Sequence, residues 1–433
     1  MMRPLTLLTV LLLAASAHAR QPNVIVIVGD DMGYGDISLH GCKDIKTPNI
    51  DSLGKNGVQC TNGYVSGPYC SPTRAGLMTG RYQTRFGHEF NPGPKDNDNH
   101  PGLSLKETTI ADRFKKAGYA TGMVGKSHLG YAPEFHPLKR GFDQYFGFLG
   151  GAHPYIPGKG AIIMRGTEAV NETEYLTDAF GREAAAFIDG HKEKPFFLYL
   201  AFNAVHTPLQ ATDPYLKRFP DLEGNRKTYA AMMAAMDDNV GKVLTKLHDS
   251  KLEEDTLIFF ISDNGGPAIN ASHNGPLNGH KATTWEGGVR VPWLVQWKGH
   301  LPTGKVYEQP VIQLDIQPTA LAAAGITDKE AKFDGVNLLP YLEGKNDAPP
   351  HDALFWRFGK QTAIRKGDWK LMDANGSNGP KLFNLKDDIG EKTDMTAKNP
   401  EKVKELQAAW DEWNKGNVAA TWGAPKLAKK KKD

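Results

Sequence analysis

Four oxygen-bearing side chains stand directly after two apolar runs of the sequence, and their chemistry suits a hard cation. Asp30 and Asp31 follow the first run, and Asp263 and Asn264 follow the second. Carboxylate and amide oxygens without histidine or cysteine favour Ca²⁺ or Mg²⁺ over zinc. A single pair would indicate a turn cap, but two pairs after two buried strands predict a cation site.

Five cationic side chains lie just beyond predicted strands or in glycine-rich loops: Arg74, Lys126, His128, His206 and Lys281. A lone histidine more often has a structural role, and a lone lysine is usually solvated. Beside a divalent cation, however, several such groups can neutralise the oxygens of a sulfate or phosphate group. The set therefore predicts an anionic substrate.

The chain contains only three cysteines, Cys42, Cys60 and Cys70. Cys42 and Cys60 could form a disulfide, or both could be small buried residues. We favour the second interpretation, because a core of this size needs no covalent staple. Cys70 is then unexplained, since neither a partner cysteine nor a metal-ligand spacing accompanies it in the segment GPYCSPTRAGLMTGRYQ.

The elements that must position these groups alternate between helix and strand. Methionine and aliphatic residues at helical spacing over 229–247 predict a helix face packed on a sheet. Such alternation predicts a doubly wound α/β sheet, which binds ligands beyond the carboxyl ends of its strands. The predicted strands cover 23–28, 120–126, 195–206 and 256–262, and the predicted helices cover 107–119, 176–191, 229–247 and 315–325.

The texture of the sequence changes near residue 351. Short alternating segments divided by Gly, Asn and Asp predict a small antiparallel sheet. A final amphipathic helix over 400–415 is expected to carry Trp410 and Trp413 on or near its apolar face.

The two ends of the chain have their own signatures. Residues 1–19 combine a positive charge, an apolar run and the small-residue site AHA, which is typical of a secretory signal peptide. We therefore expect export to the periplasm or beyond, without stable membrane insertion. The net charge of +3 lies largely at the ends, including the basic tail 426–433, and gives no case for a nucleic-acid partner.

The motifs taken together resemble the type I sulfatases of the alkaline phosphatase superfamily. CSPTRAGLMTGR resembles that family's formylglycine signature, and NVIVIVGDDMGYGD, GYATGMVGKSHLG, AFNAVHTPL, FFISDNGG and HKATTWEGGVRVPW follow in the family's order. The resemblance implies an α/β fold with a large mixed sheet sandwiched by helices. It implies a catalytic domain over 20–345 and a smaller antiparallel subdomain with a helix over 346–425.

The resemblance also implies the role of Cys70. A formylglycine-generating or anaerobic sulfatase-maturing enzyme would oxidise it to formylglycine, whose aldehyde hydrate attacks sulfur. The implied ligands of one Ca²⁺ ion are Asp30, Asp31, Asp263, Asn264 and the modified residue 70. We expect a helix from about Ala75 to turn its amides toward this centre, and we expect Cys70 itself to lie on a surface loop.

The resemblance also implies roles for the five cationic side chains. Arg74 and Lys126 would hold the hydrate and the sulfate, His128 would be the base near the hydrate, and His206 and Lys281 would serve the leaving group. Two departures from the family pattern are Thr73, where serine is commoner, and Ser127, where many members have tryptophan. The serine removes bulk near the substrate, which can alter specificity.

The expected substrate is a sulfated polysaccharide or oligosaccharide. The alternatives are small aryl or alkyl sulfates, phosphate or phosphonate monoesters, and a non-catalytic glycan-binding role, whose sign would be the loss of a core residue. Loop side chains that could contact a sugar are His88, Glu89, Asn91, His153, Tyr155, His273 and Arg357.

Overall fold

The computed structural model describes residues 20–93, 101–158, 162–375 and 377–423, so the predicted signal peptide and basic tail lie outside the described residues. A 10-stranded mixed sheet crosses the molecule in the order β11-β2-β10-β9-β1-β8-β4-β5-β6-β7. Its strands are β1 (Asn23–Gly29), β2 (Val58–Cys60), β4 (Ala120–Lys126), β5 (Gln144–Phe148), β6 (Ile163–Arg165), β7 (Glu168–Val170), β8 (Phe196–Ala201), β9 (Thr256–Ser262), β10 (Trp293–Gln296) and β11 (Lys305–Tyr307).

The centre of this sheet is parallel, and one antiparallel strand on each side, β10 and β6, separates it from the outer strands. β1 pairs in parallel with both β8 and β9, and β4 pairs in parallel with β8 and β5. β10 runs antiparallel to β9, and β6 runs antiparallel to β5. Every residue of β1 is buried, which matches its continuous β-branched sequence because helices cover both faces.

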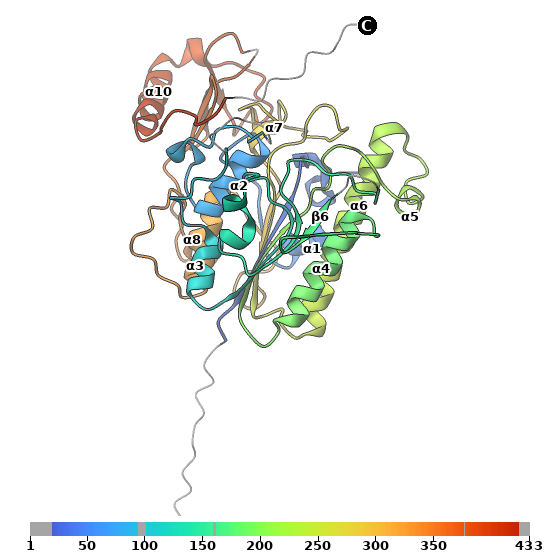
Figure 1. The fold of residues 1–433 in the computed structure, drawn as a ribbon. Coiled ribbons are helices and arrows are strands. Elements are labelled where there is room, and N and C mark those ends of the chain that lie inside the picture. The colour runs from blue at the N-terminus through green and yellow to red at the C-terminus, as the bar shows by residue number, and fades with distance from the viewer. Residues whose placement is uncertain (1–19, 94–100, 159–161, 376, 424–433) are drawn as a thin grey trace, which may run out of the picture.

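Helices pack on both faces of the sheet (Figure 1). Ile25 and Ile27 of β1 join a core with α1, α4 and α6, whereas Val24 and Val26 join a core with α2, α3 and α8. The helices are α1 (Pro48–Lys55), α2 (Cys70–Thr79), α3 (Ile110–Lys116), α4 (Leu176–Gly190), α5 (Asp213–Leu216), α6 (Gly224–Asp249), α7 (Glu286–Val289), α8 (Ile316–Ala323), α9 (Leu339–Leu342) and α10 (Pro400–Asn414).

A second, four-stranded antiparallel sheet lies beside the 10-stranded sheet and carries α10 (Figure 1). Its strands are β13 (Leu354–Phe358), β14 (Gln361–Lys366), β15 (Trp369–Asp373) and β16 (Lys381–Asn384), and a separate two-stranded sheet joins β3 (Gly63–Tyr64) to β12 (Val311–Ile312). The buried Lys370 ammonium joins the two parts, because it lies 2.9 Å from Glu286 of α7 and 2.8 Å from Glu391.

The structure confirms the expected fold class and corrects three local predictions. Helix α2 begins at Cys70 and not near Ala75, so Cys70 lies in a buried first helical turn and not on a surface loop. Helix α3 is shorter than the predicted 107–119, because its N-cap is Thr109. The predicted helix at 315–325 divides into a 3₁₀ turn (Gln313–Asp315) followed by α8.

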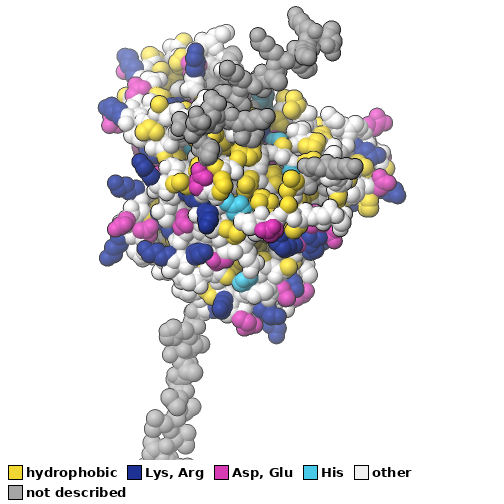
Figure 2. Space-filling model, viewed as in Figure 1, with side chains coloured by type: hydrophobic (Ala, Val, Ile, Leu, Met, Phe, Trp, Pro, Cys, Tyr) yellow, Lys and Arg dark blue, Asp and Glu magenta, His cyan; other side chains and the backbone are white. Residues whose placement is uncertain are grey.

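Cys42 and Cys60 are free and buried, as favoured from the sequence, and Cys70 is also free and buried. Among the described helices, none combines the length and apolar character that a bilayer-spanning segment requires. Figure 2 shows basic and acidic side chains intermixed on the face in view, so neither sign of charge dominates that face.

An ion pair between the 3₁₀ turn Gln313–Asp315 and the segment before β13 predicts pH-dependent stability. His351 Nε2 lies 2.8 Å from Asp315 Oδ1. Burial opposes the charged imidazolium, but the Asp315 carboxylate overcomes this effect and raises the pKa of His351 above 6.5. The stabilisation is therefore fully present below pH 6.5 and is lost as the pH rises through the raised pKa.

We expect His351→Gln to lower the free energy of unfolding by roughly 1–3 kcal/mol at pH 5.5 and by much less in alkaline solution. Urea unfolding of the variant and the parent at both pH values measures this difference. The effects of other titratable groups are common to both proteins and cancel in the difference. The exposed His300 provides a control variant, His300→Gln, with little effect at either pH. A destabilisation by His351→Gln that stays constant with pH contradicts the assignment.

Candidate active site

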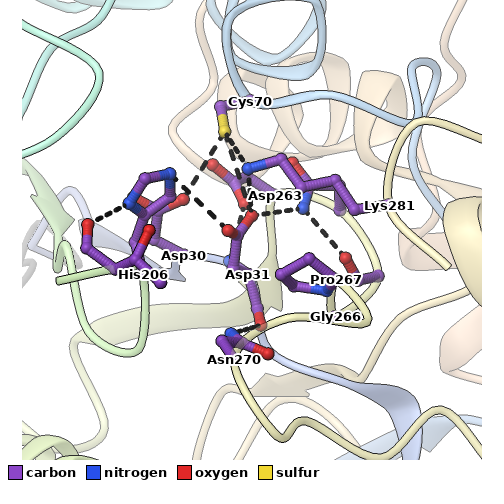
Figure 3. A network of polar contacts seen from close by, with 12 residues as sticks. Asp30, Asp31, Cys70, His206, Asp263, Gly266, Pro267, Asn270 and Lys281 are labelled. Atoms are coloured by element: carbon purple, nitrogen blue, oxygen red, sulfur yellow. Dashed lines mark hydrogen bonds and ion pairs between the residues drawn. The ribbon is translucent and has the colours of Figure 1, made fainter. Parts of the chain in front are cut away.

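The polar groups singled out in the sequence converge at the carboxyl ends of the central parallel strands (Figure 3). Asp30 and Asp31 follow β1, and Asp263 and Asn264 follow β9, whose Ser262 is in register with Gly29. Lys126 ends β4, and His206 follows β8. Because neighbouring parallel strands end at one edge, these groups meet although they are far apart in sequence.

Oxygen-rich side chains surround one point in this cluster. Ligand atoms of Asp30, Asp31, Cys70 and His206 all lie within 4.8 Å of one another. Asn264 donates from Nδ2 to Asp31 Oδ1 at 2.7 Å, while its buried Oδ1 has no hydrogen-bond partner among the described residues. Two carboxylates beside an orphaned amide oxygen fit a hard cation such as Ca²⁺.

Cys70 lies at the centre of the network and is 1% exposed. Its Sγ lies 3.6 Å from Asp30 Oδ1 and 3.2 Å from Lys281 Nζ. Burial raises the pKa of the thiol to about 12, so the cysteine side chain is a neutral thiol at pH 7. A neutral thiol is a poor nucleophile, so the thiol form of residue 70 is poorly suited to attack an ester.

Arg74 and Lys126 are buried beside the carboxylates. The guanidinium of Arg74 donates from Nε and Nη2 to Asp263 Oδ2 at 2.9 and 2.8 Å, and from Nη1 to the Lys126 carbonyl. Lys126 Nζ donates to Asp30 Oδ2 at 2.5 Å. Burial opposes ionisation of Asp30, but Lys126 and the other cations hold the pKa of that carboxyl well below its usual range.

His128 and His206 lie on loops beyond β4 and β8. Burial lowers the pKa of both imidazoles. His206 donates from Nδ1 to the Thr207 carbonyl at 2.6 Å, so the Nε2 atom of its neutral form carries no proton. That Nε2 lies 3.6 Å from Asp31 Oδ2. His128 adopts a left-handed backbone conformation, and its buried Nδ1 has no hydrogen-bond partner among the described residues.

Lys281 reaches the cluster from the loop before α7. Its Nζ donates to Asp31 Oδ1 at 2.6 Å and lies 5.1 Å from the centre of the Tyr69 ring. Burial opposes the charge, but the Asp31 carboxylate keeps the pKa of Lys281 well above its ordinary value. Lys281 is therefore a fixed cation facing residue 70 (Figure 3).

Four of the expected sugar contacts support the helix that carries Cys70 or link the C-terminal sheet to the rest of the chain. Asn91 Oδ1 accepts from the Ser71 amide, and His88 Nε2 lies 2.6 Å from Ser71 Oγ, which donates to the His128 carbonyl. Glu89 instead pairs with Arg357 at 2.9 Å, and both side chains are largely buried. Glu89 and Arg357, both proposed from the sequence as sugar contacts, thus contact each other.

The remaining three residues that were expected to contact a sugar lie on two loops. The Tyr155 hydroxyl, which is buried, donates to the His206 carbonyl at 2.8 Å and also contacts the Asn203 carbonyl. His153 stacks on Phe148. The exposed His273 faces a cavity of about 770 Å³ that Arg226 also lines, on a loop whose backbone bonds to the turn after β1.

Two residues of the site were missed in the sequence. Asn270 is fully buried and donates from Nδ2 to the Asp31 carbonyl at 3.4 Å (Figure 3). Ser262 accepts from the Met32 amide and donates to the Asn264 carbonyl. The bonds to the Asp31 carbonyl and the Met32 amide join residues distant in sequence, and a single sequence gives no signal for such contacts. The strand-end position of Ser262 was the one available indication.

The sulfatase family profile matches residues 22–326, which contain all the charged groups of the cluster. The chain belongs to the sulfatase family. This sulfatase is 37% identical over 361 residues to human N-acetylgalactosamine-6-sulfatase, covering 76% of this chain and 67% of that protein. It is 31% identical over 468 residues to mouse arylsulfatase J, covering 94% of this chain and 78% of that protein.

Solved structures resemble the sulfatase along most of its length. Ps i-CgsB in complex with k-i-k-neocarrahexaose matches with a TM-score of 0.89 and 39% identity, covering 93% of this chain and 95% of that chain. The PsFucS1 sulfatase from Pseudoalteromonas sp. matches with a TM-score of 0.79 and 25% identity, covering 93% and 92%. The sulfatase is thus a sulfuric ester hydrolase with the expected alkaline-phosphatase-like architecture.

Proposed function

We propose that this sulfatase removes sulfate from a sulfated polysaccharide or oligosaccharide, with formylglycine at position 70 and one Ca²⁺ ion. The observation that carries the proposal is the position of Cys70, buried between the Asp30 and Asp31 carboxylates and the Lys281 ammonium. A residue in this position faces both a cation site and fixed positive charge, as attack on an anionic ester requires.

Asp30, Asp31, Asp263 and Asn264 would hold the Ca²⁺ ion together with residue 70. The unpartnered Asn264 Oδ1 and the clustered carboxylates support this set. Bound Ca²⁺ supplies positive charge to the sulfate oxygens. A formylglycine at position 70 supplies a hydrated aldehyde as the nucleophile.

The protein's own side chains would orient and neutralise the ester. Arg74, Lys126 and Lys281 are buried or nearly buried cations whose positions are fixed by carboxylates. Such preorganised charge needs no reorganisation during the reaction. We assign to Arg74 and Lys126 the task of holding the sulfate group and the hydrate at residue 70.

Proton transfer falls to the groups on the loops. We assign His206 and Lys281 to the leaving-group side, where a proton must reach the departing sugar oxygen. The charged Lys281 ammonium carries such a proton, whereas His206 can supply one only in its protonated form. The lowered pKa of His128 is consistent with a base, because its imidazole is neutral at pH 7. Its assigned task is to accept a proton from the oxygen on residue 70.

Similarity to glycan-active proteins supports the substrate class. One relative is named N-acetylgalactosamine-6-sulfatase, and one similar structure holds k-i-k-neocarrahexaose. The phosphonate monoester hydrolase of Agrobacterium radiobacter shares only the fold, at 21% identity and a TM-score of 0.65. Comparison therefore favours sulfated sugars over phosphate or phosphonate esters.

The proposal includes maturation and export. A formylglycine-generating or anaerobic sulfatase-maturing enzyme would act on the Cys-Ser-Pro-Thr-Arg segment, and the signal-peptide pattern supports a periplasmic or secreted location. The carbohydrate is the proposed substrate partner.

Desulfation assays test this function. We expect matured enzyme with Ca²⁺ to release sulfate from at least one defined sulfated oligosaccharide with a kcat/KM at least about 100-fold above that for an aryl sulfate, because remote sugar contacts contribute binding energy in the transition state. The matching phosphate ester tests which type of ester bond the enzyme hydrolyses. Activity confined to aryl sulfates overturns the glycan assignment, and preference for the phosphate ester overturns the reaction.

A further inference from the structure

We propose that Gln361, in the C-terminal sheet, is a positioning residue that fixes Lys281 against residue 70. This inference rests on the proposed function for the role of Lys281 in catalysis. It extends that function to a side chain outside the strand-end cluster. The contacts of Gln361 carry the argument.

The backbone directly after Lys281 is strained. Ala282 has a φ of 66°, in the left-handed region that residues with a Cβ rarely adopt. Such a conformation costs about 1–3 kcal/mol and persists only where surrounding contacts impose it. The position of the Lys281 side chain therefore depends on the contacts that hold the Ala282 backbone in this conformation.

Gln361 supplies two of these contacts through one side-chain amide. Its Nε2 donates to the Ala282 carbonyl at 2.9 Å, and its Oε1 accepts from the Thr284 amide at 3.3 Å. On the other side, the Ala282 amide donates to the Pro68 carbonyl at 2.8 Å. Both polar backbone groups of Ala282 are thus held, one by Gln361 and one by the segment that leads into Cys70.

Gln361 is itself held firmly. It is 3% exposed and begins β14, where it pairs with Phe358 of β13 across a two-residue turn. The amide of Gly359 in that turn donates to Glu89 Oε1 at 2.7 Å. The turn between β13 and β14 therefore cannot move without breaking contacts to the catalytic domain.

The same turn also contacts the residue before Cys70. The ring centroids of Phe358 and Tyr69 lie 5.6 Å apart, and the Lys281 ammonium lies 5.1 Å from the centre of the Tyr69 ring. The hairpin turn thus supports Lys281 from its backbone through Gln361 and from its side chain through Tyr69. These two supports hold Lys281 Nζ at 3.2 Å from Cys70 Sγ.

The test combines kinetics with amide hydrogen exchange on the full-length, matured protein. Gln361→Met keeps nearly the same side-chain volume and removes both hydrogen bonds. We expect it to lower kcat for a sulfate ester by about 10–100-fold with KM changed by less than about threefold, because a displacement near 1 Å of a catalytic group costs about this much. In a Lys281→Met background, the same change should cost less than about twofold.

Thr362→Val is the matched control, since Thr362 is the next residue of β14 and points to the opposite face of the strand. It should retain the parent kcat within about twofold. Hydrogen exchange in a peptide over residues 281–285 should accelerate at least about tenfold in Gln361→Met and stay unchanged in Thr362→Val. Gln361→Asn, one methylene shorter, provides a second variant if the methionine variant does not fold.

The outcomes separate this inference from the proposed function. An equal loss of kcat in the parent and Lys281→Met backgrounds overturns the positioning role, as does unchanged exchange at 281–285. If the parent protein hydrolyses no sulfate ester, the proposed function fails. Faster exchange in Gln361→Met alone would then still support the contact between Gln361 and the Lys281 loop.

Discussion

Replacing Cys70 by alanine is expected to lower kcat for sulfate esters by at least about 10⁴-fold, as loss of a catalytic nucleophile does in other hydrolases. Alanine offers no atom that can become an aldehyde. Cys70→Ser is expected to fail as well when residue 70 remains a serine, because a sulfated serine has no second hydroxyl through which to expel sulfate. Sulfate release in single- and multiple-turnover assays measures both losses.

The burial of Cys70 makes a folding control necessary. Its side chain packs in the first turn of α2, so the alanine variant also loses roughly 1 kcal/mol of stability. Cys60 is an equally buried free cysteine, and Cys60→Ala removes the same atom away from the active-site network. Full activity in Cys60→Ala with none in Cys70→Ala supports the nucleophile. Sustained turnover by verified Cys70→Ser contradicts it.

Asp263→Ala should produce the second large effect, weakening Ca²⁺ binding and lowering kcat by about 10³-fold. The carboxylate is a proposed ligand, and it also pairs with Arg74 at 2.8 Å in a fully buried position. Without it, the Arg74 guanidinium loses its nearest counter-charge, which costs about 3–5 kcal/mol of stability. Asp263→Asn keeps the volume and one oxygen and should lose less stability while still weakening Ca²⁺ binding.

Calorimetric Ca²⁺ titration of chelator-treated protein, with urea unfolding of the same samples, measures the two effects separately. Asp334→Asn is the matched control, because Asp334 forms another Arg–Asp pair with Arg85 at 2.9 Å. This control should lose stability but keep the parent affinity for Ca²⁺. Unchanged Ca²⁺ affinity in Asp263→Asn removes Asp263 from the ligand set.

The meeting of the charged groups could be predicted from the sequence because parallel strands impose it. Once β1 and β9 are recognised as buried strands, Asp30 and Asp263 must emerge at the same edge of the sheet. The free state of Cys42 and Cys60 was favoured for an equally general reason, the size of the core. Both predictions depend on regular elements and not on local detail.

The start of α2 could not be predicted in this way. Its N-cap residue, Tyr69, makes no side-chain capping hydrogen bond, so the usual sequence signal is missing. Pro72 looks like a helix breaker but lies in the first turn, where proline is tolerated. The helix is imposed by packing, and it encloses the residue that was expected on a surface loop.

The loop residues were still less predictable, because their partners are distant in sequence. Glu89 and Arg357 were each proposed to bind sugar, yet they are 268 positions apart and bind each other. Gln361 was not considered, since glutamine in a small antiparallel sheet has no distinctive pattern. Only the docking of the C-terminal sheet reveals its contacts with Ala282 and Thr284.

Mass spectrometry of residue 70 in active enzyme from the native host tests the central claim most directly. Cleavage after Lys55 and Arg74 releases residues 56–74, which contain both Cys60 and Cys70. After thiol alkylation, we predict a peptide alkylated only at Cys60, with an aldehyde or its hydrate at position 70. A fully active preparation in which both cysteines are alkylated would contradict the account.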